Sequence, residues 1–540
     1  MTTAHPTRQT LWIALLITHL LGLVALLAWI LWQAQPVAMH DLQLASGEKL
    51  KCVSYAPYHR PGQTPFDETG SISRAQIADD LAALAKITDC VRLYSVDQGL
   101  DQVPEVARAV GLKVLVGAWI GRDQQKNAIE LDRAIAVSNA NKDVVSALIV
   151  GNEVLLRRER SVDEMRALID YAQSKAEVPI TYADVWEFWV RNDSLAKSVD
   201  FVTVHILPFW EDDPVDIEYA LKHVAAIHHE VSEHFKGSAI LIGETGWPSA
   251  GRQREASKPS PVNQARYIRE FVHQAHDRGW NYNLIEAIDQ PWKRRLEGTV
   301  GGHWGMLDAG TLEPKFPLAG PVADRKDLAT PLMAAVAGAV LALILALASG
   351  QKHHTALRTV ALTLTGATSG LIASLNLEHA HLAYRDLTEW AVLGGVALVA
   401  LMAAAALACW QGDRIPAAAD GWRALRTRPT SPATADVLGT LRGVLLFAAA
   451  VAALLLLVDS RYRDFPSLLY LIPAALYGVV GWWQRSAGRA ERICALVIAI
   501  SVIGRWLPEP ANPQAVGWLL VGLVLALPVL WPRANKHEQT

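Results

Sequence analysis

Two short stretches each place a glutamate directly after an apolar run, and both are candidates for acid–base or nucleophilic chemistry. Residues 147–152 lead into Glu153, and residues 238–243 lead into Glu244. A single glutamate after a strand is usually a solvated loop residue, so neither stretch decides the matter alone. Two carboxylates at the ends of buried strands, however, are the groups needed to cleave a glycosidic bond, one as acid and one as nucleophile or base.

The elements that must position these glutamates follow a repeating pattern, in which short strand-like runs alternate with amphipathic helical runs. The predicted strands are 50–56, 90–95, 113–119, 146–151, 178–183, 201–206, 239–243 and 282–288. The predicted helices are 77–86, 103–110, 127–141, 163–175, 217–235 and 263–277. Eight units favour an α/β fold of the (β/α)8 TIM-barrel type. The alternative is a doubly wound open sheet, which normally has fewer strands. Both glutamates would then lie at C-terminal strand ends, where barrels hold their catalytic groups.

Long apolar segments flank the predicted barrel on both sides. Residues 11–33 contain no charge and are long enough to span a bilayer, and they read as an uncleaved signal anchor with Arg8 on the cytoplasmic side. Seven further apolar segments follow residue 327, and they are 329–349, 357–375, 391–410, 441–458, 467–484, 493–507 and 515–531. The loops predicted to lie outside carry few basic residues, namely Arg385, Arg461, Arg463 and Arg505, whereas the opposite loops hold most of them.

This pattern predicts a multi-pass protein of the inner (cytoplasmic) membrane with a periplasmic, extracytoplasmic barrel inserted between the first transmembrane helix and a seven-helix, all-α membrane domain. The predicted domains are a cytoplasmic N-terminus at 1–10, the anchor at 11–33, the barrel at 44–327, the seven-span domain at 328–531 and a cytoplasmic tail at 532–540. Gly394 and Gly395 suggest close helix packing there. We expect the membrane domain to act as an anchor, with glycan export as the alternative.

Composition bears on three further questions, which are nucleic-acid binding, disulfide formation and metal binding. The chain has 540 residues, 51% of them hydrophobic, and its net charge of −3 gives no electrostatic footprint for nucleic acid. Its four cysteines show no metal-type spacing. Cys52 and Cys90 begin two neighbouring predicted strands, and we favour two buried core thiols over a disulfide. Glu378, His379 and His381 are residue types that can bind a metal, but we favour a solvated loop over a metal site here.

Two sequence blocks contain the candidate glutamates, namely Val150-Gly-Asn-Glu153 and Ile242-Gly-Glu-Thr-Gly-Trp-Pro-Ser249. Four more follow the other predicted strands in order, namely Ser54-Tyr-Ala-Pro57, Val91-Arg-Leu-Tyr94, Thr203-Val-His-Ile-Leu-Pro-Phe-Trp210 and Glu286-Ala-Ile-Asp-Gln-Pro-Trp-Lys293. Together these blocks resemble glycoside hydrolase family 17, the β-1,3-glucanases and related glucanosyltransferases. The resemblance covers about residues 50–320, and for the rest of the chain it brings to mind only membrane-anchored bacterial members that remodel β-glucans. His205 stands where many members have Asn, and Gln290 follows Asp289 where plant members have a second acid.

The resemblance implies that Glu153 is the acid/base and Glu244 the nucleophile of a retaining mechanism. Burial and the nearby charge of Glu244 should raise the pKa of Glu153, so that it is protonated at rest. Glu244 must be ionised, with Arg92 and Tyr182 as candidate donors, and Asn152 suits a hydrogen bond to the sugar 2-hydroxyl. The full set of predicted substrate-binding residues is Asn152, Arg92, Tyr55, Tyr182, His205, Trp119, Trp186, Trp247, Asp289 and Trp292.

The tryptophans in this set fall just after predicted strand ends, where flat aromatic surfaces can bind the apolar faces of sugars. Trp247, inside the turn that follows Glu244, is the first choice for such a platform.

The sequence thus predicts a membrane-anchored, retaining enzyme that acts on β-1,3-glucosidic bonds through a covalent glucosyl-enzyme. Transfer to a glucan acceptor is favoured over plain hydrolysis, endo or exo, because a membrane anchor suits synthesis or remodelling. The alternative from another class is a non-catalytic, glycan-binding or export accessory. The expected partners are a β-glucan or oligosaccharide, the lipid bilayer and glucan synthase or export machinery, without nucleic acid. Two carboxylates suffice for the chemistry, so neither a metal nor another cofactor is expected.

Overall fold

The computed structural model describes residues 8–42, 47–349, 355–427, 433–484 and 486–531. Most of the predicted N-terminal segment 1–10 and all of the predicted tail 532–540 lie outside these residues. The chain divides into two compact units, Pro36–Val322 and the combined segments Met1–Gln35 and Ala323–Thr540.

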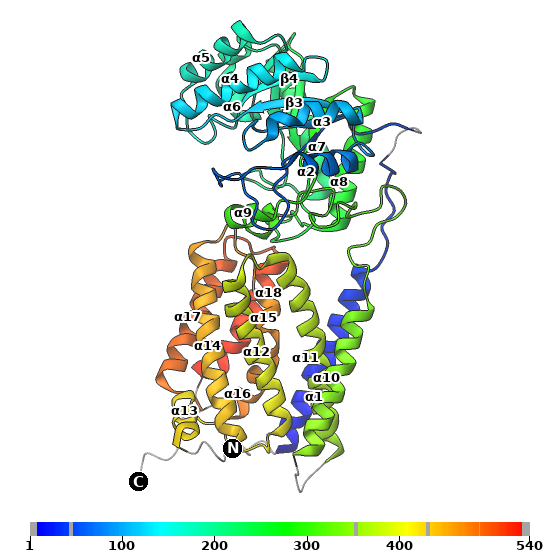
Figure 1. The fold of residues 1–540 in the computed structure, drawn as a ribbon. Helices are drawn as coiled ribbons and strands as arrows, with labels where there is room; N and C mark the ends of the chain where they lie inside the picture. The colour runs from blue at the N-terminus through cyan, green and yellow to red at the C-terminus, as the bar shows by residue number, and fades with distance from the viewer. Residues whose placement is uncertain (1–7, 43–46, 350–354, 428–432, 485, 532–540) are drawn as a thin grey trace. The chain divides into compact units, whose positions relative to one another are not determined.

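The first unit is a closed barrel of eight parallel strands in the order β1 to β8 (Figure 1). The strands are β1 Val53–Ser54, β2 Cys90–Arg92, β3 Lys113–Ala118, β4 Val145–Asn152, β5 Ile180–Val185, β6 Val202–His205, β7 Ile240–Thr245 and β8 Asn281–Leu284. The helices are α2 Arg74–Leu84, α3 Val103–Val110, α4 Gln124–Ala140, α5 Val162–Lys175, α6 Trp186–Arg191, α7 Ile217–His234, α8 Pro261–Asp277 and α9 Arg294–Gly301. The predicted TIM barrel is confirmed.

Side-chain alternation along the strands decides what lies inside this barrel. A cluster of small and apolar side chains, which includes Cys52, Cys90, Leu115, Ile149 and Ala183, is buried together. Because successive strand residues point to opposite faces, residues two positions further along a strand share the face of these groups. Ser54 and Arg92 therefore stand on the same face as Cys52 and Cys90, towards the C-terminal strand ends.

The two strand-start cysteines form a disulfide, so the preference for free core thiols is wrong. Cys52 directly precedes β1 and Cys90 is the first residue of the paired strand β2, with their Cα atoms 4.3 Å apart. The parallel register brings the two strand starts side by side, within the distance that a disulfide spans. Cys409 and Cys494 are free.

The second unit is helical. Its helices are α1 Arg8–Gln33, α10 Ala329–Ala348, α11 Ala356–Ala383, α12 Leu387–Cys409, α13 Ala418–Thr427, α14 Thr434–Val458, α15 Ser467–Pro473, α16 Val479–Gln484, α17 Arg489–Trp506 and α18 Pro513–Leu530, with a π-helical turn between α15 and α16. All eight predicted apolar segments are thus helical. Within the described ranges, six helices (α1, α10, α11, α12, α14 and α18) are long and apolar enough to cross a membrane, and Ser467–Trp483 is a shorter apolar run.

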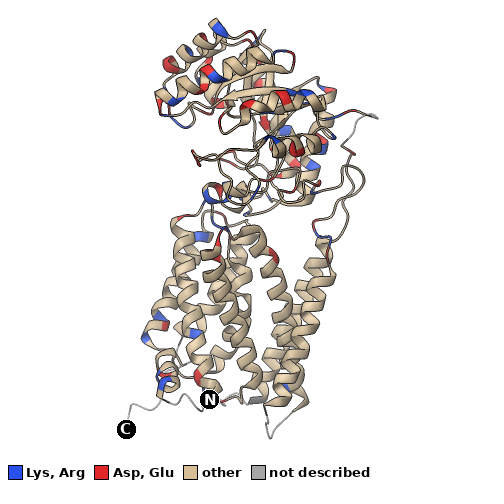
Figure 2. Cartoon of the chain, in the orientation of Figure 1, with Lys and Arg blue, Asp and Glu red and all other residues tan. Residues whose placement is uncertain are grey.

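Charged residues are sparse in this helical unit and common over the barrel unit (Figure 2). Helices α10 and α11 approach each other closely, and a Cβ added to Gly338 would lie 2.2 Å from the Gly366 carbonyl oxygen. Gly394 and Gly395, predicted to mark such a contact, have no atom within 4 Å of an added Cβ. Gly338 and Gly366 therefore permit the close approach of α10 and α11, whereas Gly394 and Gly395 mark no such contact.

Candidate active site

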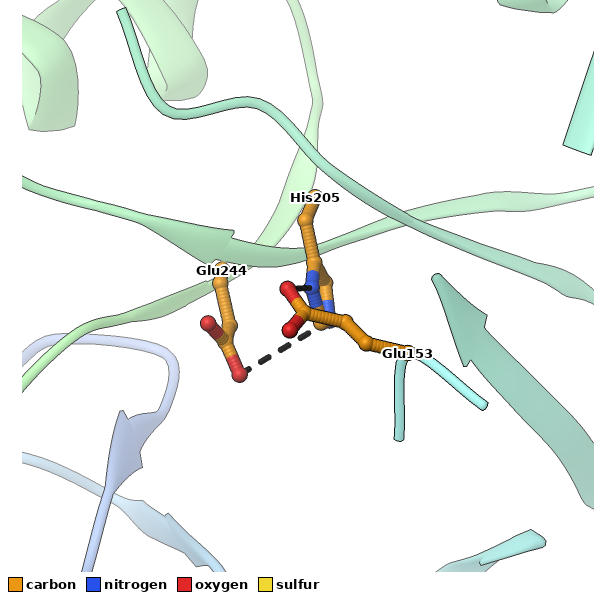
Figure 3. Close-up of side chains that lie close together, drawn as sticks. All are labelled: Glu153, His205 and Glu244. Carbon is orange, nitrogen blue, oxygen red and sulfur yellow. Dashed lines mark hydrogen bonds and ion pairs between the residues drawn. The ribbon is translucent and has the colours of Figure 1, made fainter. Parts of the chain in front are cut away.

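The two glutamates singled out in the sequence meet at the C-terminal end of the barrel. Glu153 follows the last residue of β4, and Glu244 is the penultimate residue of β7. One oxygen of each carboxylate and one ring nitrogen of His205 lie within 4.8 Å of one another (Figure 3). So close an approach of the nearest oxygens favours the short carboxyl separation of retaining glycosidases over the gap of about 6.5–9.5 Å in inverting ones.

Arg92 and Tyr94 hold the carboxylate of Glu244. Nη1 of Arg92 donates to Glu244 Oε1 at 3.0 Å and to the Gly243 carbonyl at 2.7 Å, and the Tyr94 hydroxyl lies 2.8 Å from the same Oε1. The Arg92 and Glu244 side chains are only 1% and 6% exposed. Burial and then the charge of Glu244 raise the pKa of Tyr94 well above its ordinary value, so the phenol keeps its proton and donates. Glu244 is therefore held with two donors on one oxygen.

His205 contacts the carboxylate of Glu153 and lies close to that of Glu244. His205 Nδ1 lies 2.9 Å from Glu153 Oε1, and its Nε2 lies 3.8 Å from Glu244 Oε1. The backbone of Glu153 has a φ of 52°, a left-handed conformation that costs a non-glycine residue about 1 kcal/mol or more. The Glu153 amide is fixed by the Ala183 carbonyl at 2.8 Å, and the carboxylate is 23% exposed.

The pKa of Glu153 is lowered, which is opposite to the direction predicted from the sequence. Burial does raise it, as expected, but the hydrogen bond and charge of His205 and the charges of Arg157 and Arg92 act in the opposite direction and prevail. The ligand-free site thus favours an ionised Glu153.

Arg92 also connects the two strands that carry the glutamates. Its Nη2 donates to Asn152 Oδ1 at 2.5 Å, so one guanidinium contacts both the residue before Glu153 and the carboxylate of Glu244. The prediction that Arg92 is a donor to Glu244 is confirmed. The predicted second donor is wrong, because the Tyr182 hydroxyl bonds the Asp184 carboxylate and accepts from the Leu155 amide at 3.0 Å.

Two other predicted substrate-binding residues are buried in structural contacts. The Tyr55 hydroxyl donates to Asp80 of α2 at 2.8 Å, and the tyrosine is 1% exposed. Asp289 accepts from the Gly305 amide and from Lys315 Nζ at 2.8 and 2.7 Å. Neither side chain is placed to meet a sugar.

The tryptophans predicted to bind sugar differ in solvent exposure. Trp247, the first choice, is fully buried and packs on Phe209 and Tyr267 at ring-centroid distances of 5.6 and 5.7 Å, so that prediction is wrong. Trp119 is 42% exposed and stacks with the Arg157 guanidinium. Trp186 and Trp292 are half-buried, and Trp292 meets the 67% exposed Phe66 edge to face.

Sequence reasoning missed two groups near Glu244. Tyr94 is two residues after Arg92 and therefore shares its strand face, a signal that was available. Glu286, in the loop after β8, is buried against Lys293 at 2.9 Å. Burial raises the pKa of Glu286 to about 7, Lys293 opposes that rise, and Glu244 adds to it. Its buried position depends on the path of the loop and had no signal in the sequence.

Carboxylates beside a histidine can also bind a metal ion. Glu153, His205 and Glu244 offer suitable atoms, and they are the one such group among the residues that the structure describes. However, Arg92 already supplies positive charge to Glu244 at 3.0 Å, which disfavours a cation there. Glu378, His379 and His381, expected in a solvated loop, instead lie on α11, where Glu378 pairs with Arg325 at 2.8 Å and His379 lies 3.7 Å from Asp464.

Comparison with known proteins agrees with this geometry. Residues 52–305 match the family model of the BtgE/BtgC glycoside hydrolase domain. A probable glucan endo-1,3-beta-glucosidase, btgC of Aspergillus clavatus, is 27% identical over 44% of this chain and 38% of its own length. A glucan 1,3-beta-glucosidase of Saccharomyces cerevisiae is 25% identical over 44% of this chain and 82% of its own. The chain therefore spans about two fifths of the longer Aspergillus relative.

Among solved structures, an active-site mutant of a Rhizomucor miehei beta-1,3-glucanosyltransferase in complex with laminaritriose is 24% identical. It aligns with 49% of this chain and 95% of its own, with a TM-score of 0.44. The fold, the paired carboxylates and the family match together define the class of the barrel, which is a glycoside hydrolase domain. More particularly, residues 52–305 of the barrel match the family 17-like BtgE/BtgC glycoside hydrolase domain. The relatives named here are fungal.

Proposed function

We propose that this chain is a membrane-anchored, retaining enzyme that cleaves β-1,3-glucosidic bonds and transfers the glucosyl unit to a glucan acceptor. The observation that supports this most directly is the approach of Glu153 and Glu244 to within 4.8 Å across the barrel mouth. Glu244, oriented by Arg92 and Tyr94, attacks the anomeric carbon. Glu153 protonates the leaving oxygen and then deprotonates the incoming hydroxyl.

Asn152 and Trp119 are the proposed substrate contacts. The Oδ1 of Asn152 is held by Arg92, which leaves its Nδ2 to donate to the sugar 2-hydroxyl. Trp119 offers an exposed indole face next to the site. Both contacts would be strongest for a glucosyl ring lying between the two carboxylates.

The proposed location is the cytoplasmic membrane, with several spans, both termini cytoplasmic and the barrel outside. The apolar helices and the uneven distribution of basic loop residues support this topology. The Cys52–Cys90 disulfide supports it independently, because disulfides persist in oxidising compartments such as the periplasm. An anchored enzyme on that side suits the synthesis or remodelling of a glucan better than its digestion.

The test is to incubate the full-length chain, purified in detergent, with laminari-oligosaccharides of one length and to separate the products. Transfer predicts products longer than the donor, and the linkage they contain can be read from their fragmentation. Exclusively shorter products would identify a plain hydrolase instead. Unchanged oligosaccharides, together with binding that Glu153→Gln and Glu244→Gln leave intact, would favour the non-catalytic alternative.

A further inference from the structure

His205 lies between the two carboxylates of the site. Its side chain is fully buried, with Nδ1 2.9 Å from Glu153 and Nε2 3.8 Å from Glu244. Nε2 makes no hydrogen bond within the described part of the chain. A fully buried imidazole that faces one carboxylate with each nitrogen is well suited to carry a proton.

We propose that His205 and Glu153 share one mobile proton, which is stored on His205 Nδ1 in the resting enzyme and passed to Glu153 when a donor binds. This inference rests on the proposed function and deepens it. His205 acts through Glu153, so it is a positioning residue for the acid/base rather than a catalytic residue. The hydrogen bond from His205 to Glu153 couples the two groups directly, with Nδ1 2.9 Å from Oε1.

Charged groups from several elements face His205. Glu153 after β4, Glu244 on β7 and Asp184 on β5 are the carboxylates, and the charges of Glu153 and His205 both act on Asp184. Arg92 and Arg157 oppose them, but each is already committed. Arg92 bonds Glu244 and Asn152, and Arg157 bonds the Asn152 carbonyl and Glu159. Tyr94 is neutral and donates to Glu244.

The proton balance closes over one turnover. The imidazolium gives its Nδ1 proton to Glu153, and the ring becomes neutral with its remaining proton on Nε2, facing Glu244. Glu244 bonds to the anomeric carbon while the old glycosidic bond breaks, and the leaving oxygen takes the proton from Glu153. In the second half an acceptor hydroxyl attacks the same carbon, the bond to Glu244 breaks, and Glu153 takes the hydroxyl proton and returns it to Nδ1.

The test compares two donors on full-length wild type and His205→Asn in detergent. One donor is a laminari-oligosaccharide, whose leaving oxygen needs a proton, and the other is a dinitrophenyl β-laminaribioside, whose leaving group does not. We expect His205→Asn to lower kcat/KM about 100-fold on the oligosaccharide, the range of general acid catalysis, and less than about fivefold on the aryl donor. The alkaline limb of the pH profile should shift only for the oligosaccharide.

Trp189→Phe is the matched control. It removes the hydrogen bond from the Trp189 indole to the carbonyl of Thr203, which lies on β6 like His205, and it alters no contact of a carboxylate. Trp189→Phe should change kcat/KM by the same factor for both donors. An equal loss on both donors in His205→Asn, with an unmoved pH profile, would overturn the proposal. Wild type that cleaves neither donor would instead overturn the proposed function itself.

Two further measurements guard against a variant that does not fold. His205→Gln repeats the comparison with a different amide side chain, and circular dichroism reports folding of each variant. In wild type alone, kcat/KM must show an alkaline limb for the oligosaccharide that the aryl donor lacks. The same limb on both donors would contradict the shared proton.

Discussion

Both units of the chain bury arginines, but the contacts of these arginines differ in kind. In the barrel, Arg92 joins the side chains of Glu244 and Asn152. In the helical unit, Arg442 pairs with Glu491 at 2.8 Å and also donates to the carbonyls of Pro416 and Ser486. Arg358 donates to the carbonyls of Ala408 and Trp410, at the end of α12.

The difference separates charge used for chemistry from charge used for structure. In the helical unit the buried guanidinium groups hold structure together: Arg358 donates to carbonyls at a helix end, where backbone carbonyls need donors, and Arg442 pairs with Glu491 in the first turn of α17. The barrel directs one at a carboxylate that remains 6% exposed at a strand end. Loss of a buried arginine should therefore affect activity in the barrel but not in the helical unit, and this can be tested.

The largest expected effect follows loss of either glutamate. Glu244→Gln should lower kcat by at least about 10⁴-fold, because it removes the nucleophile, and Glu153→Gln should lower it by about 10²–10⁴-fold. Steady-state hydrolysis and transfer assays measure both. Retained activity in Glu244→Gln would show that the barrel site is not catalytic in the way described.

Arg92→Met and Arg442→Met compare the two units directly. Each breaks a buried ion pair and should cost about 3 kcal/mol or more of stability, seen as a lower Tm by circular dichroism. Only Arg92→Met should also lower kcat, by about 100-fold, since Glu244 then loses its charged donor. A comparable fall in kcat for Arg442→Met would mean that the helical unit takes part in catalysis.

Asp184 predicts how barrel stability depends on pH. Burial raises its pKa to about 6, above the ordinary value of 3.8, so the folded barrel binds its proton more tightly than the unfolded chain does. The stability from this group is complete below pH 3.8 and falls by about 3 kcal/mol as the pH rises to about 6. Denaturant titrations over this window should show that slope, and Asp184→Asn should lack it.

The smallest expected effect distinguishes two tryptophans of the barrel. Trp119→Ala should raise KM about tenfold, equivalent to about 1.4 kcal/mol, because the exposed indole is the proposed sugar platform. Trp247→Phe should lower Tm and leave KM unchanged, since Trp247 is fully buried. The opposite pattern would place the platform at the turn after β7.

Much of this architecture could be predicted, because the apolar runs of the barrel strands mark buried parallel strands in chain order. Glu153 and Glu244 follow from where two of those runs end, and Arg92 from its place on β2. Side-chain alternation explains two of the errors. Ala183 and Ser54 lie on the inner face, so Tyr182 and Tyr55 beside them point outward.

Other features depend on contacts that adjacent residues do not reveal. The direction of Trp247 is set by packing on Phe209 and Tyr267, from other elements. The disulfide depends on the register of β1 against β2. The lowered pKa of Glu153 depends on His205, which lies 52 residues away in the chain. These properties belong to tertiary distances, whereas the strand pattern is local.

The most direct test of the central claim is to trap the glycosyl-enzyme. The full-length chain would be incubated with a 2-deoxy-2-fluoro β-laminaribioside that carries a dinitrophenyl leaving group, then digested and analysed by peptide mass spectrometry. We predict one covalent glycosyl group on Glu244, absent from Glu244→Gln. A label on another residue, or turnover with inversion at the anomeric carbon and no label, would contradict the account.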